Sequence, residues 1–160
     1  MSANIESTAQ AVREALHEDE VRRCWPVYEA LRPQLDEAEF LRRWRLQREE
    51  GYRIAFIEAD GVVVAAAGFR LMHTMAWGKI LYLDDLGALP GQQGRGWGSA
   101  LLVWLQAEAR RLQCEAVHLD TGYHRHAAHK AYLRNGFELS CHHLIATIWH
   151  GKPNSGPGNA

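Results

Sequence analysis

The fold of this 160-residue chain is decided by the stretch Ile80-Leu81-Tyr82-Leu83-Asp84-Asp85-Leu86-Gly87-Ala88-Leu89-Pro90 and the glycine-rich run Gly91-Gln92-Gln93-Gly94-Arg95-Gly96-Trp97-Gly98 that follows it. The run leads directly into Ser99–Leu112, an apolar-rich segment of helical length. This order predicts a strand, a glycine turn and a helix. Such a turn leaves unpaired backbone N–H groups at a helix N-terminus, which is a ready site for a phosphate-bearing ligand.

Three interpretations of the glycine turn compete. A nucleotide P-loop needs a lysine and then Ser or Thr after its last glycine, but Gly98 is followed by Ser99 and Ala100. A dinucleotide fingerprint would use Gly94, Gly96 and Ser99, with Asp120 as its ribose acid, but it lacks the third glycine. A merely tight turn without a ligand stays open on the glycines alone.

The remaining segments predict an α/β fold. We expect a short strand or helix at Ala11–Leu16 and a helix at about Glu20–Leu31 with Asp19 as N-cap, and Pro26 is expected either to kink this helix or to make it begin later. A helix from Asp36 to Glu50 should end at Gly51, and strands at Tyr52–Ala59 and Val62–Leu71 should be joined by an Asp60-Gly61 turn. The later elements are a turn at Ala76–Gly78, a strand at Ala116–Asp120, a helix at His126–Asn135 and strand-like segments at Phe137–Leu139 and His142–Trp149.

The helix between the strands at Ile80 and Ala116 implies that these two strands run parallel. The expected architecture is therefore a mixed, mostly antiparallel sheet of about six strands, with one βαβ crossover and helices on both faces.

Composition and charge restrict the class of protein. Apolar residues make up 47% of the chain and the formal net charge is −1, which fits one globular domain over residues 1–150 and gives no electrostatic footprint for nucleic acid or an anionic membrane. No apolar run is long enough to cross a bilayer, and the first residues lack a leader pattern. Cys24, Cys114 and Cys141 show no disulfide framework, so a cytoplasmic protein is expected, with a disordered tail at 151–160.

Two sequence blocks in this order resemble the GNAT family of acyl-CoA-dependent N-acetyltransferases. The first is the stretch Leu86–Leu102, which contains Gln93-Gly94-Arg95-Gly96-Trp97-Gly98, and the second is Ala128–Phe137 with its Tyr132 and Gly136-Phe137. Arg125 stands where the family often carries asparagine. The resemblance covers about Ile80 to Phe137 and implies the GNAT fold with acetyl-CoA as cosubstrate.

The expected cofactor-binding residues lie in the first block. The pyrophosphate is expected at the turn, where backbone N–H groups and the helix dipole attract negative charge. The resemblance implies that the pantetheine arm pairs with the main chain of the strand, where Gly87 is the expected irregularity, and that an N–H near Ala88 or Leu89 faces the thioester oxygen. The cofactor-binding prediction comprises Leu86, Ala88, Gln93, Gly94, Arg95, Gly96, Trp97, Gly98 and Ser99.

The expected catalytic residues are Tyr132, Asp84 and Asp85. The resemblance places Tyr132 at the general-acid position, and a phenol with a pKa of about 10 can return a proton to a thiolate. Asp84 and Asp85 are adjacent in a strand and are expected on opposite faces, where one of them attracts the acceptor amine or takes its proton through water. A purely structural role for either carboxylate, or core packing for Tyr132, is the alternative.

The acceptor cannot be read from the sequence beyond a small-molecule primary amine. Its pocket is expected near Trp25, Tyr28, Trp44 and His73–Trp77, although tryptophan-rich helices are equally compatible with a homodimer interface. The nine histidines have no metal-ligand spacing, so no metal is expected. A non-catalytic acyl-CoA sensor of the same fold, or an acyltransferase acting on a protein or peptide, is the alternative function.

Overall fold

The computed structural model describes residues 12–148 and has a five-stranded sheet in the order β1-β2-β3-β4-β5. The predicted tail at 151–160 and the terminal residues Ala11 and Trp149 of two predicted segments lie outside the described range. The strands are β1 (Val12–Glu14), β2 (Arg53–Ala59), β3 (Val62–Thr74), β4 (Gly78–Ala88) and β5 (Ala116–Leu119), and the helices are α2 (Glu18–Arg23), α3 (Trp25–Leu31), α4 (Glu37–Glu49), α5 (Trp97–Arg111) and α6 (His126–Arg134).

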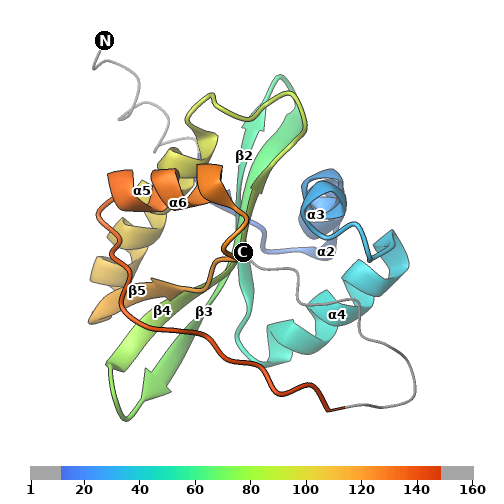
Figure 1. Ribbon diagram of the computed structural model, residues 1–160. Coiled ribbons are helices and arrows are strands. Elements are labelled where there is room, and N and C mark those ends of the chain that lie inside the picture. Colours follow the sequence, from blue (N-terminus) through green and yellow to red (C-terminus); the bar gives the residue numbers. More distant parts are fainter. Residues whose placement is uncertain (1–11, 149–160) are drawn as a thin grey trace.

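The sheet is mixed, as predicted, with three antiparallel neighbours and one parallel pair, β4 and β5. Helices α5 and α6 cover one face, and α2, α3 and α4 cover the other (Figure 1). Each face has its own apolar core, one built around α5 and the other around α3 and α4. The βαβ crossover through α5 and the two-sided cover are therefore confirmed.

The predicted helix at about Glu20–Leu31 is two helices, with the interruption near Pro26 that the sequence indicated and a different N-cap. Helix α2 begins after the N-cap residue His17, not Asp19, and the chain breaks at Cys24. Pro26 lies in the first turn of α3. Proline lacks an N–H and is tolerated only in a first helical turn, so a new helix begins there.

Helix α4 and the hairpin after it follow the sequence prediction closely. The Asp36 side chain caps α4 by accepting from the Glu39 N–H at 2.8 Å. Asp60 and Gly61 join β2 to β3 with φ of 51° and 77°, the left-handed pair that a two-residue hairpin turn requires.

Strand β4 contains a bulge at a position that the sequence did not indicate. Gly68 in β3 pairs with Asp85, whereas the next residue, Phe69, pairs with Leu83, so Asp84 is one extra residue in β4. The alternation of side chains shifts there: Leu83 and Leu86, three residues apart, both belong to the core on the α5 side. The irregularity is therefore at Asp84, whereas Gly87 was the expected position.

The segment after α6 does not form the predicted strands. Residues 137–148 have no ladder partner and run past β5 as an extended, mostly exposed chain. Alternating apolar residues favour an extended backbone, but a strand also needs a paired edge, which local sequence does not specify. The described sheet therefore has five strands and not about six. Across residues 12–148, the structure contains no helix with the length and apolarity that crossing a bilayer requires.

Candidate functional site

Strand β4 loses one of its two neighbours halfway along its length. Its parallel register with β5 ends at Leu83, opposite Leu119, whereas its register with β3 continues to Ala88. The Leu89 N–H donates to the Val64 carbonyl at 2.9 Å, and hydrogen-bonded pairs alternate along an antiparallel ladder. The backbone groups of Leu86 and Ala88 therefore point away from β3, toward the edge of β4 that β5 does not pair with.

This polarity decides between the two backbone donors proposed from the sequence. Leu89 is already bonded to Val64, so the expectation for its N–H is wrong. The Ala88 N–H is directed to the unpaired side, together with the main chain of Leu86. We call residues Asp84–Ala88 the open half of β4.

The glycine turn lies directly after the open half and ends at the N-terminus of α5. Gly91, Gly94 and Gly96 have φ of 82°, 75° and 86°, in the left-handed region that favours glycine. Gly96 is the N-cap and has no side chain to satisfy the first amides of the helix, whose first backbone bond is donated by Ala100. The N–H groups before Ala100 and the dipole of this 15-residue helix therefore favour an anion.

The side chains of the turn behave differently from its backbone. Gln93 and Arg95 are exposed, whereas the Trp97 indole N–H donates to the Gln92 side chain at 3.3 Å. The Ser99 hydroxyl accepts a hydrogen bond from Asn135 at 3.0 Å, which ties the start of α5 to the end of α6. Trp97 and Gly98 belong to the first turn of α5.

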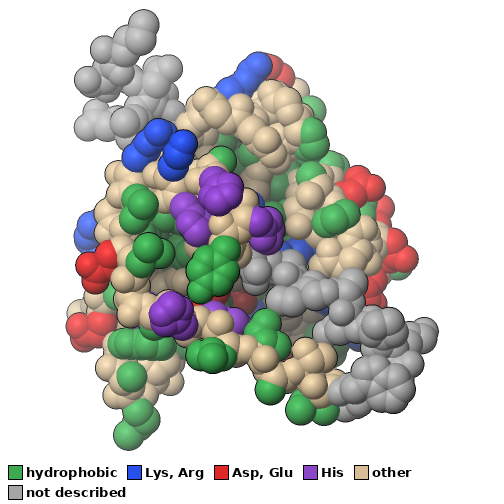
Figure 2. All heavy atoms as spheres, in the orientation of Figure 1, with side chains coloured by type: hydrophobic (Ala, Val, Ile, Leu, Met, Phe, Trp, Pro, Cys, Tyr) green, Lys and Arg blue, Asp and Glu red, His purple; other side chains and the backbone are tan. Residues whose placement is uncertain are grey.

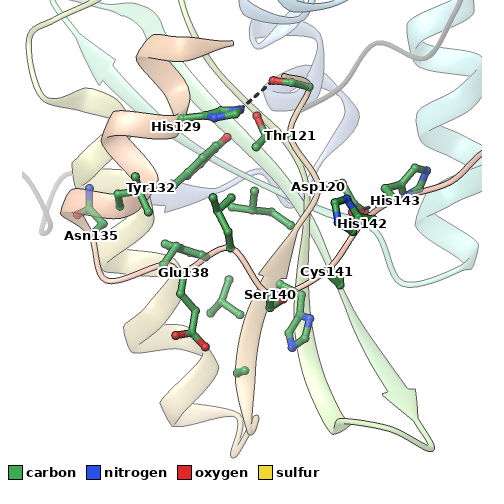
Figure 3. A pocket seen from close by; sticks show the side chains of 18 of the residues that line it. Asp120, Thr121, His129, Tyr132, Asn135, Glu138, Ser140, Cys141, His142 and His143 are labelled. Carbon is green, nitrogen blue, oxygen red and sulfur yellow. Dashed lines mark hydrogen bonds and ion pairs between the residues drawn. The ribbon is translucent and has the colours of Figure 1, made fainter. Parts of the chain in front are cut away.

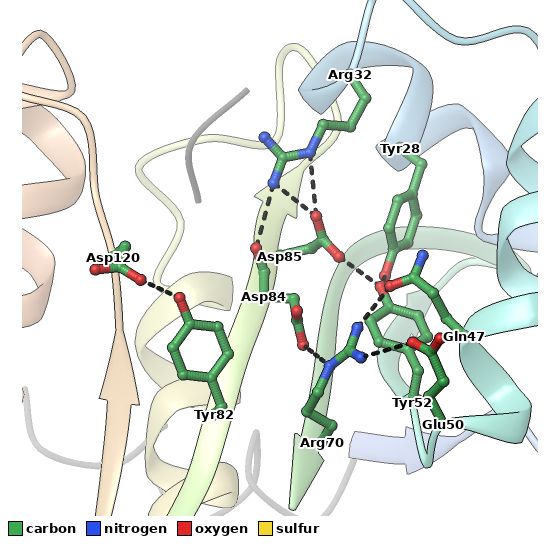
Figure 4. Close-up of polar contacts among 10 residues, drawn as sticks. All are labelled: Tyr28, Arg32, Gln47, Glu50, Tyr52, Arg70, Tyr82, Asp84, Asp85 and Asp120. Carbon is green, nitrogen blue, oxygen red and sulfur yellow. Dashed lines mark hydrogen bonds and ion pairs between the residues drawn. The ribbon is translucent and has the colours of Figure 1, made fainter. Parts of the chain in front are cut away.

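The bulge places Asp84 and Asp85 on the same face of the sheet, toward α3 and α4, and not on opposite faces (Figure 4). Asp85 accepts from Arg32 through Nη2 at 2.6 Å and Nε at 3.1 Å, and from the Tyr52 hydroxyl at 2.5 Å. Asp84 accepts from Arg70 Nε at 3.0 Å. Each carboxylate therefore has its own arginine.

The two carboxylates differ in how firmly they are held. Tyr28 and Tyr52 hydroxyls are 2.7 Å apart, and because Tyr52 donates to Asp85, Tyr28 must donate to Tyr52. Asp85 thus ends a buried chain of hydrogen bonds. Burial raises the pKa of Asp84 to about 6, against the opposing hydrogen bond and charge of Arg70.

Gly68 makes room for this tyrosine chain. A Cβ atom added at Gly68 would lie 1.8 Å from the Tyr52 hydroxyl oxygen and 2.7 Å from that of Tyr28. The absence of a side chain opposite the bulge therefore allows the tyrosines to reach Asp85.

Tyr132 comes to the other side of the sheet from α6. Its side chain is 4% exposed, lies in the same apolar cluster as Leu83 and Leu86, and stacks edge to face on Phe137 at 5.8 Å. Its hydroxyl is buried with no hydrogen-bond partner and points toward Thr121 and His129 (Figure 3). Burial raises the pKa of Tyr132, against the charges of Arg125 and Arg32.

A cavity of about 930 Å³ lies between β5, α6 and the extended segment after α6 (Figure 3). Tyr132, Thr121 and His129 are among the residues that line it. Histidine side chains gather on this face (Figure 2). Within residues 12–148, however, no three His, Cys, Asp or Glu side chains are grouped to hold a metal ion.

The residues expected around the acceptor pocket are divided between the core on the α3 and α4 side and the turn between β3 and β4, from which Trp77 lines the cavity described above. Tyr28 and Trp44 are buried in the core on the α3 and α4 side, where they pack rather than line a surface. His73–Trp77 surround the turn between β3 and β4, at the opposite end of β4 from the carboxylates. Trp25 packs against the same core at Phe40.

Sequence reasoning missed the partners of the carboxylates: Arg32, Tyr52 and Arg70. These residues come from three different elements and carry no motif. Two adjacent acids in an apolar strand did signal that partners were required, because unpaired buried charges are costly. Nothing local specified which residues would supply them.

The fold and this site define the class of protein. A model described as the acetyltransferase (GNAT) family matches residues 13–137, and the chain belongs to that family. Over 91 residues it is 35% identical to the aminoalkylphosphonate N-acetyltransferase of Salmonella typhimurium, a match that covers 56% of this chain and 57% of that protein. The aligned part thus spans little more than half the length of that relative.

Solved structures share the fold at low sequence identity. The aminoglycoside N-acetyltransferase AAC(6')-Iy in complex with CoA has a TM-score of 0.76 and 17% identity, over 86% of this chain and 93% of that one. Its complex with a CoA-acetylneamine bisubstrate analogue also has a TM-score of 0.76 and 17% identity, over 87% and 97% of the two chains. A GNAT family acetyltransferase from Staphylococcus aureus has a TM-score of 0.71 and 16% identity, over 86% and 97%.

Proposed function

We propose that the protein transfers an acetyl group from acetyl-CoA to the primary amine of a small molecule by direct attack in a ternary complex. The observation that carries the proposal is the buried hydroxyl of Tyr132, which has no protein partner and lies beside the open half of β4. A buried polar group without a partner needs an explanation, and a ligand atom that binds there supplies one.

The cofactor is assigned to the open half and the glycine turn. The amides of residues 93–99 and the dipole of α5 favour the pyrophosphate, as other helix N-termini favour phosphate groups. The outward backbone groups of Leu86 and Ala88 can pair with the amides of the pantetheine arm, as an added strand would. The Ala88 N–H is then a donor for the thioester oxygen as it gains charge.

Asp84 is the better of the two carboxylates for taking the proton from the amine. A general base works best with a pKa near the working pH, and that of Asp84 is raised to about 6. Asp85 accepts hydrogen bonds from Arg32 and Tyr52, and we assign it the role of positioning these two side chains.

Tyr132 is assigned as the acid for the leaving thiolate. In the step, the amine nitrogen forms a bond to the thioester carbon, and the carbon–sulfur bond breaks. The sulfur takes the Tyr132 proton, and the nitrogen gives one up to Asp84, directly or through water. Burial raises the pKa of Tyr132, so the phenol stays protonated at neutral pH and its proton is available to the sulfur as the carbon–sulfur bond breaks.

The names of the relatives indicate the breadth of acceptors. One acts on aminoalkylphosphonates and another is a complex with an acetylneamine analogue, so both concern amines on small molecules. A small-molecule primary amine is the class that these two share, and we assign it to this protein.

The test is Tyr132→Phe, assayed by CoA release with acetyl-CoA and a panel of amines. Turnover should fall about 100-fold, the lower end for loss of a general acid, with little change in acetyl-CoA affinity. Tyr123→Phe is the matched control, because Tyr123 is 81% exposed, and it should keep normal turnover.

Three outcomes would contradict the proposal. Unchanged turnover in Tyr132→Phe would remove this tyrosine from the mechanism. Tight acetyl-CoA binding with no CoA release for any amine would favour the non-catalytic sensor, and release only with peptides would favour a protein acyltransferase.

A further inference from the structure

The two arginines beside the carboxylates use their nitrogens differently. Arg70 engages all three: Nε bonds Asp84, Nη2 bonds Gln47 at 2.6 Å and Nη1 reaches Glu50 at 3.4 Å. Arg32 gives Nε and Nη2 to Asp85, and Nη2 also bonds the Asp84 carbonyl at 3.2 Å. Its third nitrogen, Nη1, is buried and has no hydrogen-bond partner, and the whole residue is only 9% exposed (Figure 4).

Arg32 Nη1 belongs to a small set of such atoms. Within residues 12–148, the buried side-chain polar atoms without a partner are Arg32 Nη1, Thr121 Oγ1 and the Tyr132 hydroxyl. They come from three elements, the end of α3, the loop after β5 and helix α6, and the charge of Arg32 acts on the pKa of Tyr132. Arg32 bonds Asp84 and Asp85 of the open half, and Tyr132 shares an apolar cluster with Leu86 of the open half. Thr121 lies near the Tyr132 hydroxyl (Figure 3).

An unused donor favours an acidic acceptor at the free nitrogen. Asp85 is paired with Arg32 and Asp84 with Arg70, so neither pair carries a net charge, and Arg32 differs from Arg70 in keeping one N–H without an acceptor. A guanidinium N–H without an acceptor is the strongest unused donor in this region, and a charged acceptor makes the strongest bond with it.

We propose that Arg32 Nη1 binds an acidic group of the acceptor, so that the substrates are small amines that also carry a phosphonate, phosphate or carboxylate. This inference rests on the proposed function for its amine. The ammonium or amine end then faces Asp84 and the acidic end faces Arg32. A polyamine or aminoglycoside, in contrast, would bring a second cation beside the guanidinium.

Four acceptors separate these classes: 2-aminoethylphosphonate, β-alanine and ethanolamine, which are of similar length, and spermidine, which is a longer polyamine. Wild-type protein should show a kcat/KM at least about 10-fold higher for one of the two acidic amines than for ethanolamine, the range of one charged hydrogen bond. The first two compounds distinguish a phosphonate from a carboxylate. Equal values for ethanolamine, or preference for spermidine, would overturn the inference while leaving acetyl transfer intact.

Arg32→Lys tests the residue itself. Lysine keeps the charge and can still pair with Asp85, but it lacks the planar fork that presents a third N–H. The variant should raise KM for the acidic amine about 10-fold or more relative to its effect on KM for ethanolamine, and it should leave the KM for acetyl-CoA unchanged. The control is Arg70→Lys, which should not change the preference for acidic over neutral amines, because every Arg70 nitrogen already has a protein partner.

Ethylphosphonate, which lacks the amine, gives a readout on the wild-type protein. It should inhibit competitively against the acceptor and not against acetyl-CoA. Competition against acetyl-CoA, or an equal loss for all acceptors in Arg32→Lys, would assign Arg32 to the cofactor or to the fold instead. If no amine is acetylated, calorimetric titration of ethylphosphonate into the CoA-bound protein and its Arg32→Lys variant decides separately: weaker binding to the variant supports the anion site, and equal or absent binding overturns it.

Discussion

The two halves of β4 differ in neighbours and in chemistry. Residues Ile80–Leu83 lie between β3 and β5, and Ile80, Leu81 and Leu83 are completely buried. Residues Asp84–Ala88 pair with β3 alone and carry two carboxylates and the outward backbone groups. The first half holds the sheet together, and the second half leaves donors and charges available because one neighbouring strand is missing.

The largest expected effect is a difference in unfolding free energy between a variant of Asp85 and a variant of Asp84. Asp85→Ala leaves Arg32 buried and unpaired, and breaking one side of such a pair costs about 3–5 kcal/mol of unfolding free energy. Asp84→Ala should cost clearly less, because Arg70 keeps Gln47 and Glu50 and Asp84 is partly exposed. Denaturant unfolding of both variants measures this, and equal losses would contradict the division between the two carboxylates.

The second effect concerns the titration of Asp84. If Asp84 is the base, kcat/KM should fall as pH drops through about 6, because the protonated carboxyl cannot accept a proton. Asp84→Asn should lower turnover about 100-fold and remove this acidic limb from the pH profile. A limb that persists in the variant would assign the titration to another group.

The free energy of unfolding should also depend on the titration of Asp84. Activity is expected to need the ionised carboxylate, whereas stability should be greater when the carboxyl is protonated. A carboxyl whose pKa is raised on folding, from 3.8 to about 6, favours the folded state when it is protonated. That contribution is complete below about pH 4 and is lost as pH rises through 6. The unfolding free energy of wild-type protein relative to Asp84→Asn should therefore decrease between pH 4 and pH 7.

The smallest effect tests the direction of the backbone groups in the open half. Ala88→Pro removes an N–H that points away from β3, so acetyl-CoA should bind about 10-fold more weakly while stability changes little. Gly87→Pro removes a donor on the β3 side and should lower stability instead. Calorimetric titration with CoA and thermal unfolding distinguish them, and the reverse pattern would invert the assigned polarity.

Local sequence signals predicted the parts of the fold that depend on local chemistry. The Asp36 cap, the Asp60-Gly61 turn, the glycines before α5 and the parallel β4–β5 pair were all found as expected. The cap and the turns depend on residues close together in the chain, and the parallel pairing follows from the helix that connects β4 to β5. The acetyltransferase family followed from two such blocks in the right order.

The parts that were missed depend on contacts between distant segments. Arg32 reaches Asp85 across 53 positions of sequence, and no pattern around Arg32 marks it as that partner. The bulge at Asp84 arises from the pairing of β4 with Gly68, which the apolar pattern of β4 alone does not encode. The segment 137–148 had the alternation of a strand but no edge to pair with.

The extra residue at Asp84 changes which face of the sheet every later side chain of β4 occupies. Because side chains alternate with a period of two, one added residue moves each later side chain to the opposite face, so that Asp85 faces the tyrosines and Leu86 faces the α5 core. Deleting Asp84 would restore the regular alternation, and each later side chain would then lie on the opposite face from the one it occupies now. If β4 is to keep its catalytic half, its length is therefore as constrained as its composition.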